Sequence, residues 1–203
     1  MKKLCSLFFI VFLISTCGVF AQESGSIDAM NRLLSNNLKY PAELRQSETE
    51  GLVVVSVAVD PRGVMTGEYE VLYGELAFEQ EVARMLNLLK ENWDPSYLEG
   101  KTYGAEYLMS FDFKLSKGVG FPSNPNLTSS QQNAEVSPLK AVSQALTENP
   151  FSPKLYKNRA EILINEGQEL RAEMDLNQAE FLENKMLTEI VIVGYLSEGS
   201  KSL

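Results

Sequence analysis

The chain has 203 residues, and its 27 acidic and 18 basic side chains give a formal net charge of −9. It contains no histidine, which excludes Ser-His-Asp catalysis, Cys-His catalysis and histidine-ligated metal sites. The acidic balance also disfavours binding to nucleic acids and to anionic lipid surfaces.

The N-terminus has the pattern of an export signal. Two lysines precede an apolar run from Leu4 to Ala21 that ends in small residues. We therefore predict that residues 1–21 are a signal peptide, which is removed together with both cysteines of the chain. A retained membrane anchor is an alternative, because this run lies at the short end of the roughly 17–25 residues that span a bilayer. A lipid anchor on Cys17 is a further alternative.

The segment after the signal begins with a helix and a hairpin. Apolar residues at helical spacing predict a helix over residues 27–39, and Tyr40-Pro41 ends it because the residue before proline is driven out of the helical conformation. Alternating valines predict a strand over residues 51–60. The sequence Asp60-Pro61-Arg62-Gly63 is typical of a turn, so we expect an antiparallel partner strand over residues 64–73.

A second helix and a long strand follow the hairpin. An apolar stripe predicts a helix over residues 75–92, which ends at Trp93-Asp94-Pro95. Residues 103–115 alternate between apolar and polar, as in a strand with one apolar face. This order of elements predicts an α+β fold over residues 27–115, with a small antiparallel sheet packed against helices.

The second half of the chain has a different character. Residues 116–138 lack periodicity and are rich in Ser, Asn, Gln, Gly and Pro, which predicts a flexible linker between domains. We expect residues 139–187 to be helical, in three stretches at 139–148, 154–166 and 169–184. The tail, residues 188–203, opens with a β-branched run that predicts a strand.

Several local patterns in the first half occur together in one known family. They are Tyr40-Pro41 before the first strand, the sequence GLVVVSVAVDPRG at residues 51–63, and Trp93-Asp94-Pro95-Ser96 followed by Gly100-Lys101. With these patterns, residues 35–115 resemble the C-terminal domain of TonB, the periplasmic energy transducer of Gram-negative envelopes.

The resemblance implies a periplasmic domain that binds proteins by strand addition. In that family an extended peptide of an outer-membrane transporter, the TonB box, pairs with an exposed sheet edge, where backbone groups supply affinity and alternate side chains supply selectivity. By this resemblance we expect the strand at 103–115 to be the edge. Its alternating side chains are the candidate partner-binding residues Tyr103, Ala105, Tyr107, Met109, Phe111 and Phe113.

The sequence departs from TonB in lacking the family's long proline-rich spacer. Only residues 22–30 separate the apolar N-terminal run from the first helix, a reach of about 30 Å at ~3.3–3.6 Å per residue. We therefore expect a periplasmic protein-binding module that engages transporters or other envelope partners. A membrane-anchored transducer for nutrient uptake and an envelope scaffold that transduces no energy are the alternatives, and a homodimer through exposed edges is possible for any of the three.

Two further resemblances lie in the second half. Residues 139–183 resemble tetratricopeptide helices, because Ala160, Ala172 and Ala179 have the spacing of the small residues that let paired helices approach. The run at 188–195 resembles a segment near the TonB box of TonB-dependent transporters. The tail could therefore bind the chain's own sheet edge through Ile190, Val191, Ile192, Val193 and Tyr195, although a strand that simply completes the sheet is the plainer interpretation.

No pattern in the sequence predicts catalysis, a cofactor or a metal site. Acidic residues cluster at helical spacing, which is typical of a solvated helix face. The sequence contains no phosphate-binding loop, nucleophile elbow or paired-cysteine motif. We therefore expect a protein that acts through protein contacts and is not an enzyme.

Overall fold

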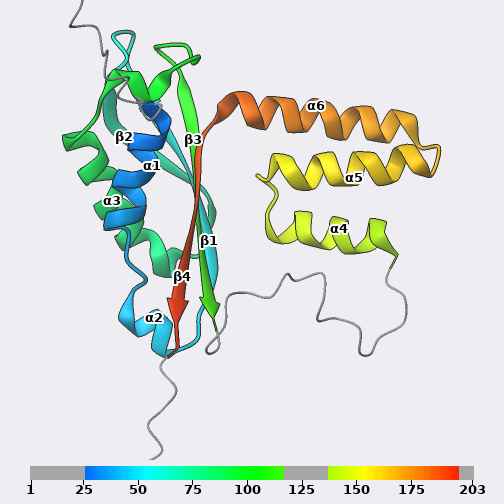
Figure 1. Cartoon of the computed structure of the whole chain (residues 1–203), viewed down its shortest axis with the longest axis horizontal. Helices are drawn as coiled ribbons and strands as arrows, with labels where there is room; N and C mark the ends of the chain where they lie inside the picture. The colour runs from blue at the N-terminus through cyan, green and yellow to red at the C-terminus, as the bar shows by residue number, and fades with distance from the viewer. Residues whose placement is uncertain (1–25, 117–136, 197–203) are drawn as a thin grey trace, which may run out of the picture.

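The computed structural model describes residues 26–116 and 137–196 (Figure 1). The expected signal peptide, residues 117–136 of the expected linker and residues 197–203 of the tail lie outside the described residues. The first half contains α1 (Ser26–Asn37), α2 (Ala42–Gln46), β1 (Gly51–Val59), β2 (Met65–Gly74), a short 3₁₀ turn (Leu76–Phe78), α3 (Glu79–Glu91), a second 3₁₀ turn (Pro95–Leu98) and β3 (Glu106–Ser116). The second half contains α4 (Pro138–Glu148), α5 (Pro153–Asn165), α6 (Glu169–Lys185) and β4 (Met186–Tyr195).

The four strands form one mixed sheet in the order β2-β1-β3-β4. β1 pairs antiparallel with both β2 and β3, whereas β4 pairs parallel with β3. The α+β fold class is confirmed, and three of the strands form the expected antiparallel sheet. The fourth strand is parallel because the chain returns through the helices α4–α6 before it rejoins the sheet.

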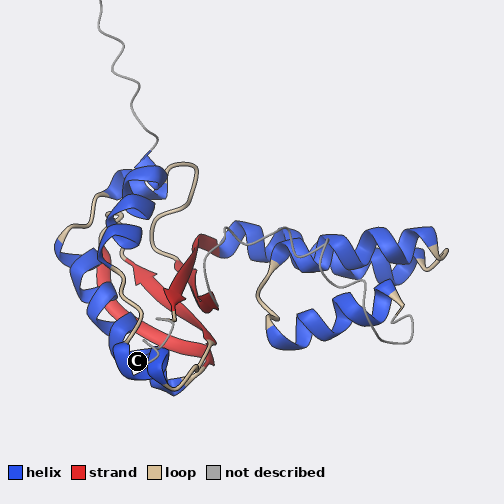
Figure 2. Cartoon of the chain, turned by 60° about the horizontal axis from the view of Figure 1, so that its bottom comes forward, coloured by secondary structure: helices blue, strands red, loops and turns tan. Residues whose placement is uncertain are grey.

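One face of the sheet carries the main hydrophobic core, and we call it the helix-covered face. Alternate residues of β1 and β3 point to this side and are fully buried; they are Val53, Val55, Val57, Met109, Phe111 and Phe113. α1 and α3 lie against it in both views (Figures 1 and 2). Each large apolar side chain buried here contributes about 1.5–3 kcal/mol of transfer free energy.

The elements of this half follow from local sequence. In α3 the buried residues Val82, Met85, Leu86 and Leu89 fall on one helical face, and acidic residues occupy the first turn, where the helix dipole favours them. In the turn after β1, the Asp60 carboxylate accepts hydrogen bonds from the backbone N–H groups of Arg62 (2.8 Å) and Val64 (2.9 Å). The bond from Val64 is the main cause that lowers the pKa of Asp60. The expected helix and hairpin are thus confirmed.

The helices α4, α5 and α6 lie side by side on the other side of the sheet, which we call the second face (Figures 1 and 2). Serines cap two of them: Ser137 accepts from the N–H of Lys140, and Ser152 accepts from the N–H of Leu155. The small residues at the α5–α6 contact, Ala160, Ala172 and Ala179, are buried, so the two helices approach closely. The three expected helical stretches are confirmed.

An ion pair joins α5 to α6 near the middle of their contact. Two of the three Arg159 guanidinium nitrogens, Nε and Nη2, each donate to the Asp175 carboxylate at 2.7 Å. The Asp175 side chain is only 8% exposed and that of Arg159 is 23% exposed. The hydrogen bond to Asp175 is the main cause that raises the pKa of Arg159.

Candidate protein-binding edge of the sheet

The outer edge of β3 is occupied by β4. The two strands pair from Leu108–Met186 to Ser116–Tyr195, with one register irregularity near the start. The expectation that the strand at 103–115 forms the edge of the sheet is therefore wrong for this structure. The edge strands of the described sheet are β2 and β4.

The candidate partner-binding residues of β3 lie mostly in the core. The side chains that share the helix-covered face are at most 3% exposed; they are Tyr107, Met109, Phe111 and Phe113. Tyr103 is half exposed and Ala105 half buried, and both precede the strand, which begins at Glu106. The strand starts later than expected because Gly104 has a φ of +70°, which interrupts the extended backbone. The backbone edge of β3, and not these side chains, is the part that a neighbouring strand can reach.

The tail residues divide between the two faces of the sheet. Ile190 and Ile192 belong to the helix-covered face, where Ile190 is 8% exposed and Ile192 is partly buried. The residues between them point to the second face and are exposed: Val191 is 63%, Val193 44% and Tyr195 67% exposed. β4 therefore contributes to the core with one side and presents an apolar surface with the other.

Near the end of β4, the backbone of Gly194 packs closely against the ring of Tyr40. A Cβ atom on Gly194 would lie 2.7 Å from Tyr40 Cδ2, closer than real Cβ contacts, and 3.0 Å from Leu115 Cδ2, which is also tight. The Tyr40 ring cannot easily yield, because its hydroxyl donates to the carbonyl oxygen of Thr49 and its ring packs edge-on against two phenylalanines. Burial raises the pKa of the Tyr40 hydroxyl. Glycine at position 194 therefore allows the end of β4 to pair with β3 beside the Tyr40 ring.

Two lysines make hydrogen bonds that hold the junction between α6 and β4 against the loop and strand next to it. Lys101 Nζ donates to the carbonyl oxygens of Glu183 and Asn184, each at 2.9 Å, and Lys185 Nζ donates to the carbonyl oxygen of Glu106 at 3.3 Å. A cation at this position satisfies free carbonyl groups at the C-terminus of α6 and interacts favourably with the helix dipole. Burial lowers the pKa of Lys101.

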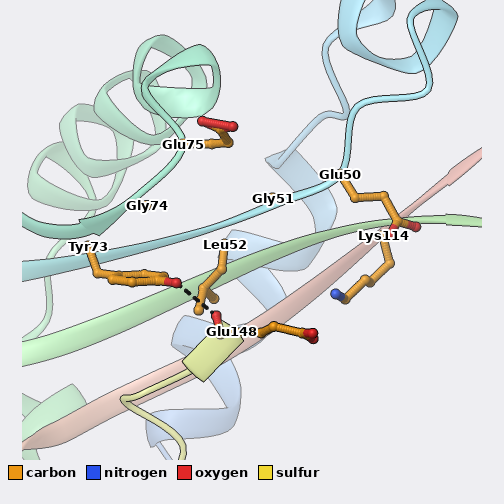
Figure 3. Close-up of a pocket in the computed structure, with 8 residues that line it drawn as sticks. All are labelled: Glu50, Gly51, Leu52, Tyr73, Gly74, Glu75, Lys114 and Glu148. Carbon is orange, nitrogen blue, oxygen red and sulfur yellow. Dashed lines mark hydrogen bonds between the residues drawn. The ribbon is translucent and has the colours of Figure 1, made fainter. Parts of the chain in front are cut away.

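The second face holds a cavity of about 500 Å³ beside the end of α4 (Figure 3). The Tyr73 hydroxyl donates to the carbonyl oxygens of Thr147 (3.3 Å) and Glu148 (3.1 Å), and this contact joins the helices to β2. The lining residues are Glu50, Gly51, Leu52, Tyr73, Gly74, Glu75, Lys114 and Glu148. Within residues 26–116 and 137–196, no group of three or more Cys, Asp or Glu side chains is arranged to hold a metal ion.

Two carboxyl groups on the second face have raised pKa values. Asp112 is paired with Val191 of β4, and burial raises its pKa although Lys114 Nζ lies 3.4 Å from its Oδ1. Burial also raises the pKa of Glu189. In both cases burial disfavours the charged form of the carboxyl group.

The comparisons with known proteins agree with this geometry over the first half of the chain. Residues 36–115 match the family model described as Gram-negative bacterial TonB protein C-terminal. The match confirms a TonB C-terminal-like domain from the end of α1 through β3. TonB C-terminal domains are non-enzymatic domains of the bacterial envelope that interact with proteins such as outer-membrane transporters. Comparisons with curated proteins and with solved structures found no match.

The match to the TonB C-terminal family ends at β3, so α4, α5, α6 and β4 lie beyond it. The tetratricopeptide resemblance of these helices stays a prediction. Among the helices that the structure describes, none is long and apolar enough to cross a membrane.

The tail forms the expected strand and completes the sheet beside β3, as the plainer interpretation of its sequence predicts. The parallel direction and the register of this pairing do not follow from the sequence. The available signal was the β-branched run of residues 190–193 followed by Gly194, which is typical of a strand that packs closely on its neighbours.

Proposed function

We propose that the chain is an exported protein-binding module of the bacterial envelope that takes up an extended segment of a partner by strand addition. The partner strand lies along the outer edge of β3, in the place that β4 takes in the free chain. Outer-membrane transporters are the partners that the TonB C-terminal match favours. In this proposal β4 occupies the partner's binding site until the partner strand displaces it.

The pairing of β4 with β3 carries this proposal. It supports strand addition because the edge of the TonB C-terminal-like domain accepts an extended segment from outside the family match. That segment is uncharged from Ile190 to Tyr195 and alternates between buried and exposed side chains. Backbone pairing supplies affinity that any extended peptide can use, and the buried alternate positions supply selectivity for β-branched residues.

A peptide titration of the processed full chain tests the proposal. The probe is a synthetic peptide with the sequence of residues 187–196, and the control peptide has the same composition in scrambled order. β4 competes with the peptide for the edge of β3. The apparent affinity of the peptide therefore equals its intrinsic affinity multiplied by the fraction of chains in which β4 has left that edge. We expect the peptide to bind and the amides of β4 to lose hydrogen-exchange protection as it does.

A matched pair of variants makes the test sharper. Gly194→Ala loosens β4 through its clash with Tyr40, and a loss of about 1.4 kcal/mol in β4 docking makes the edge about ten times more accessible. The control, Val191→Ala, trims an exposed side chain of the same strand. We expect tighter peptide binding by Gly194→Ala than by Val191→Ala. Absence of binding to both variants, or binding that leaves the β4 amides protected, contradicts strand replacement.

The export part of the proposal has its own measurement. A mature chain that begins at Gln22 and is found in the soluble periplasmic fraction supports the module. A chain that retains residues 1–21 in the inner-membrane fraction favours the anchored transducer instead. An envelope scaffold is favoured if the processed chain shows no peptide binding in the titration above.

A further inference from the structure

The outer edge of β4 is one of the two edges of the described sheet that lack a neighbouring strand; the other belongs to β2. β4 ends the strand order, and in Figure 1 its ribbon passes in front of β3 and β1 with no helix or strand in front of it. An edge strand presents unpaired backbone N–H and C=O groups, which form a template for another strand. Proteins normally protect such edges with charges, proline or bulges.

The two edge strands differ in this protection. β2 carries Glu68 and Glu70, and its pairing with β1 is interrupted by two register irregularities. β4 has no charged residue and no proline from Ile190 to Tyr195, and its pairing with β3 is regular from Thr188 onward. The sequence of β2 thus discourages a further strand from pairing with its outer edge, whereas the sequence of β4 favours such pairing.

The side chains of β4 support the same conclusion. Val191, Val193 and Tyr195 alternate along one side of the strand and expose 44–67% of their surface. Cross-strand pairs of β-branched and aromatic residues are the contacts that stabilise paired strands. A strand added to β4 would bring such residues next to these three.

We propose that β4 of one chain pairs antiparallel with β4 of a second copy, so that the two sheets form one continuous sheet across a two-fold axis. With Ile192 on the axis, Val191 lies opposite Val193 of the other copy. Glu189, the one acidic residue of β4, then lies opposite Tyr195 and away from its own equivalent. In this register the strand places apolar side chains opposite each other and keeps the two Glu189 carboxylates apart, so it can pair with itself across a two-fold axis.

The excess of acidic over basic side chains opposes association of two copies over long distances. This repulsion acts between charges outside the paired strands, so salt screens it, with a Debye length of about 8 Å at physiological ionic strength. The contact itself consists of backbone hydrogen bonds and apolar side chains, which salt does not weaken. The dimer is consequently tighter at high salt than at low salt.

Sedimentation equilibrium of the processed full chain tests the proposal. We expect a reversible monomer–dimer equilibrium in which the dissociation constant falls as salt is added. Val191→Lys places a charge on the edge of each copy, and we expect the dissociation constant to rise by about tenfold or more. Leu72→Lys is the matched control, since Leu72 is an exposed apolar residue of the other edge strand, and we expect it to leave the dimer unchanged.

A third variant separates loss of pairing from loss of folding. Val191→Thr keeps a β-branched, uncharged residue, and we expect it to remain dimeric with an unchanged circular dichroism spectrum. The proposal is overturned if the wild-type chain stays monomeric at every concentration and salt level, or if Val191→Lys and Leu72→Lys dissociate the dimer equally. The peptide of residues 187–196 can also pair with the outer edge of β4, so hydrogen exchange separates the two proposals: a peptide on the outer edge leaves the β4 amides protected, whereas a peptide that replaces β4 on β3 exposes them.

Discussion

Replacing Asp175 by alanine tests how the helical part of the chain is held together. Asp175 and Arg159 form the two-point ion pair between α6 and α5, and the Asp175 side chain is only 8% exposed. Removal of one partner from a buried pair costs about 3–5 kcal/mol, because the remaining charge is left without compensation. The 23% exposure of the Arg159 side chain lets water reach part of the guanidinium. Alanine also improves the helix propensity of α6 by about 0.5 kcal/mol.

These terms leave an expected loss of about 2–3 kcal/mol in the free energy of unfolding of the helices. Urea denaturation followed by circular dichroism measures the loss, and hydrogen exchange of the α5 and α6 amides locates it. The matched control is Glu183→Ala, which removes a pair with Lys157 that joins the same two helices but is about half exposed. A solvent-exposed pair contributes at most about 1 kcal/mol, so this control should have little effect.

A double variant completes the experiment. Arg159→Met with Asp175→Leu removes both charges and fills the space with apolar side chains, and buried pairs replaced in this way often lose little or no stability. We expect the double variant to be more stable than Asp175→Ala. Equal losses for Asp175→Ala and Glu183→Ala, or a double variant less stable than the single one, would refute the reasoning.

Three further predictions concern the sheet. Phe113→Ala removes a fully buried ring stacked on Phe78 at 4.1 Å and should lower the free energy of unfolding by about 3–5 kcal/mol in chemical denaturation, whereas a loss below 1 kcal/mol would contradict this packing. Lys101→Met removes the cation at the C-terminus of α6 and should cost about 1 kcal/mol, with faster hydrogen exchange in the last turn of that helix; unchanged exchange would argue against the contact. Asp112 has a raised pKa in the folded chain, so its ionisation destabilises the fold as pH rises through that pKa. Asp112→Asn should therefore be more stable than the wild type at neutral pH and lose this advantage below the unfolded pKa of about 3.9, and an advantage independent of pH would refute the assignment.

The first half of the fold could be predicted because its signals are local. The valines of β1 alternate without interruption, Asp60 supplies the acceptor that closes the turn, and the apolar residues of α3 repeat at helical spacing. Each of these patterns acts within a few residues, so the sequence alone indicates the element. The helices α4, α5 and α6 were predictable for the same reason.

The candidate site could be predicted only in part, because its decisive contact joins segments distant in sequence. An apolar, uncharged run such as residues 190–193 pairs with any free edge, and its own sequence fixes neither the partner strand nor the direction. The side chains of β3 were misplaced for a related reason. Alternation shows that a strand has two different faces, but it does not show which backbone edge remains free.

The parallel pairing of β4 with β3 also determines the order in which the chain becomes complete during synthesis. β3 ends at Ser116 and β4 begins at Met186, so about 70 residues must emerge between the two strands. At roughly 5–20 residues per second this interval lasts on the order of ten seconds. During that time the hairpin of β1 and β2 and the antiparallel β3 can already assemble, while the outer edge of β3 is open to any extended chain nearby. Pairing of β4 with β3 then closes this edge and ends the period in which another extended chain can pair with it.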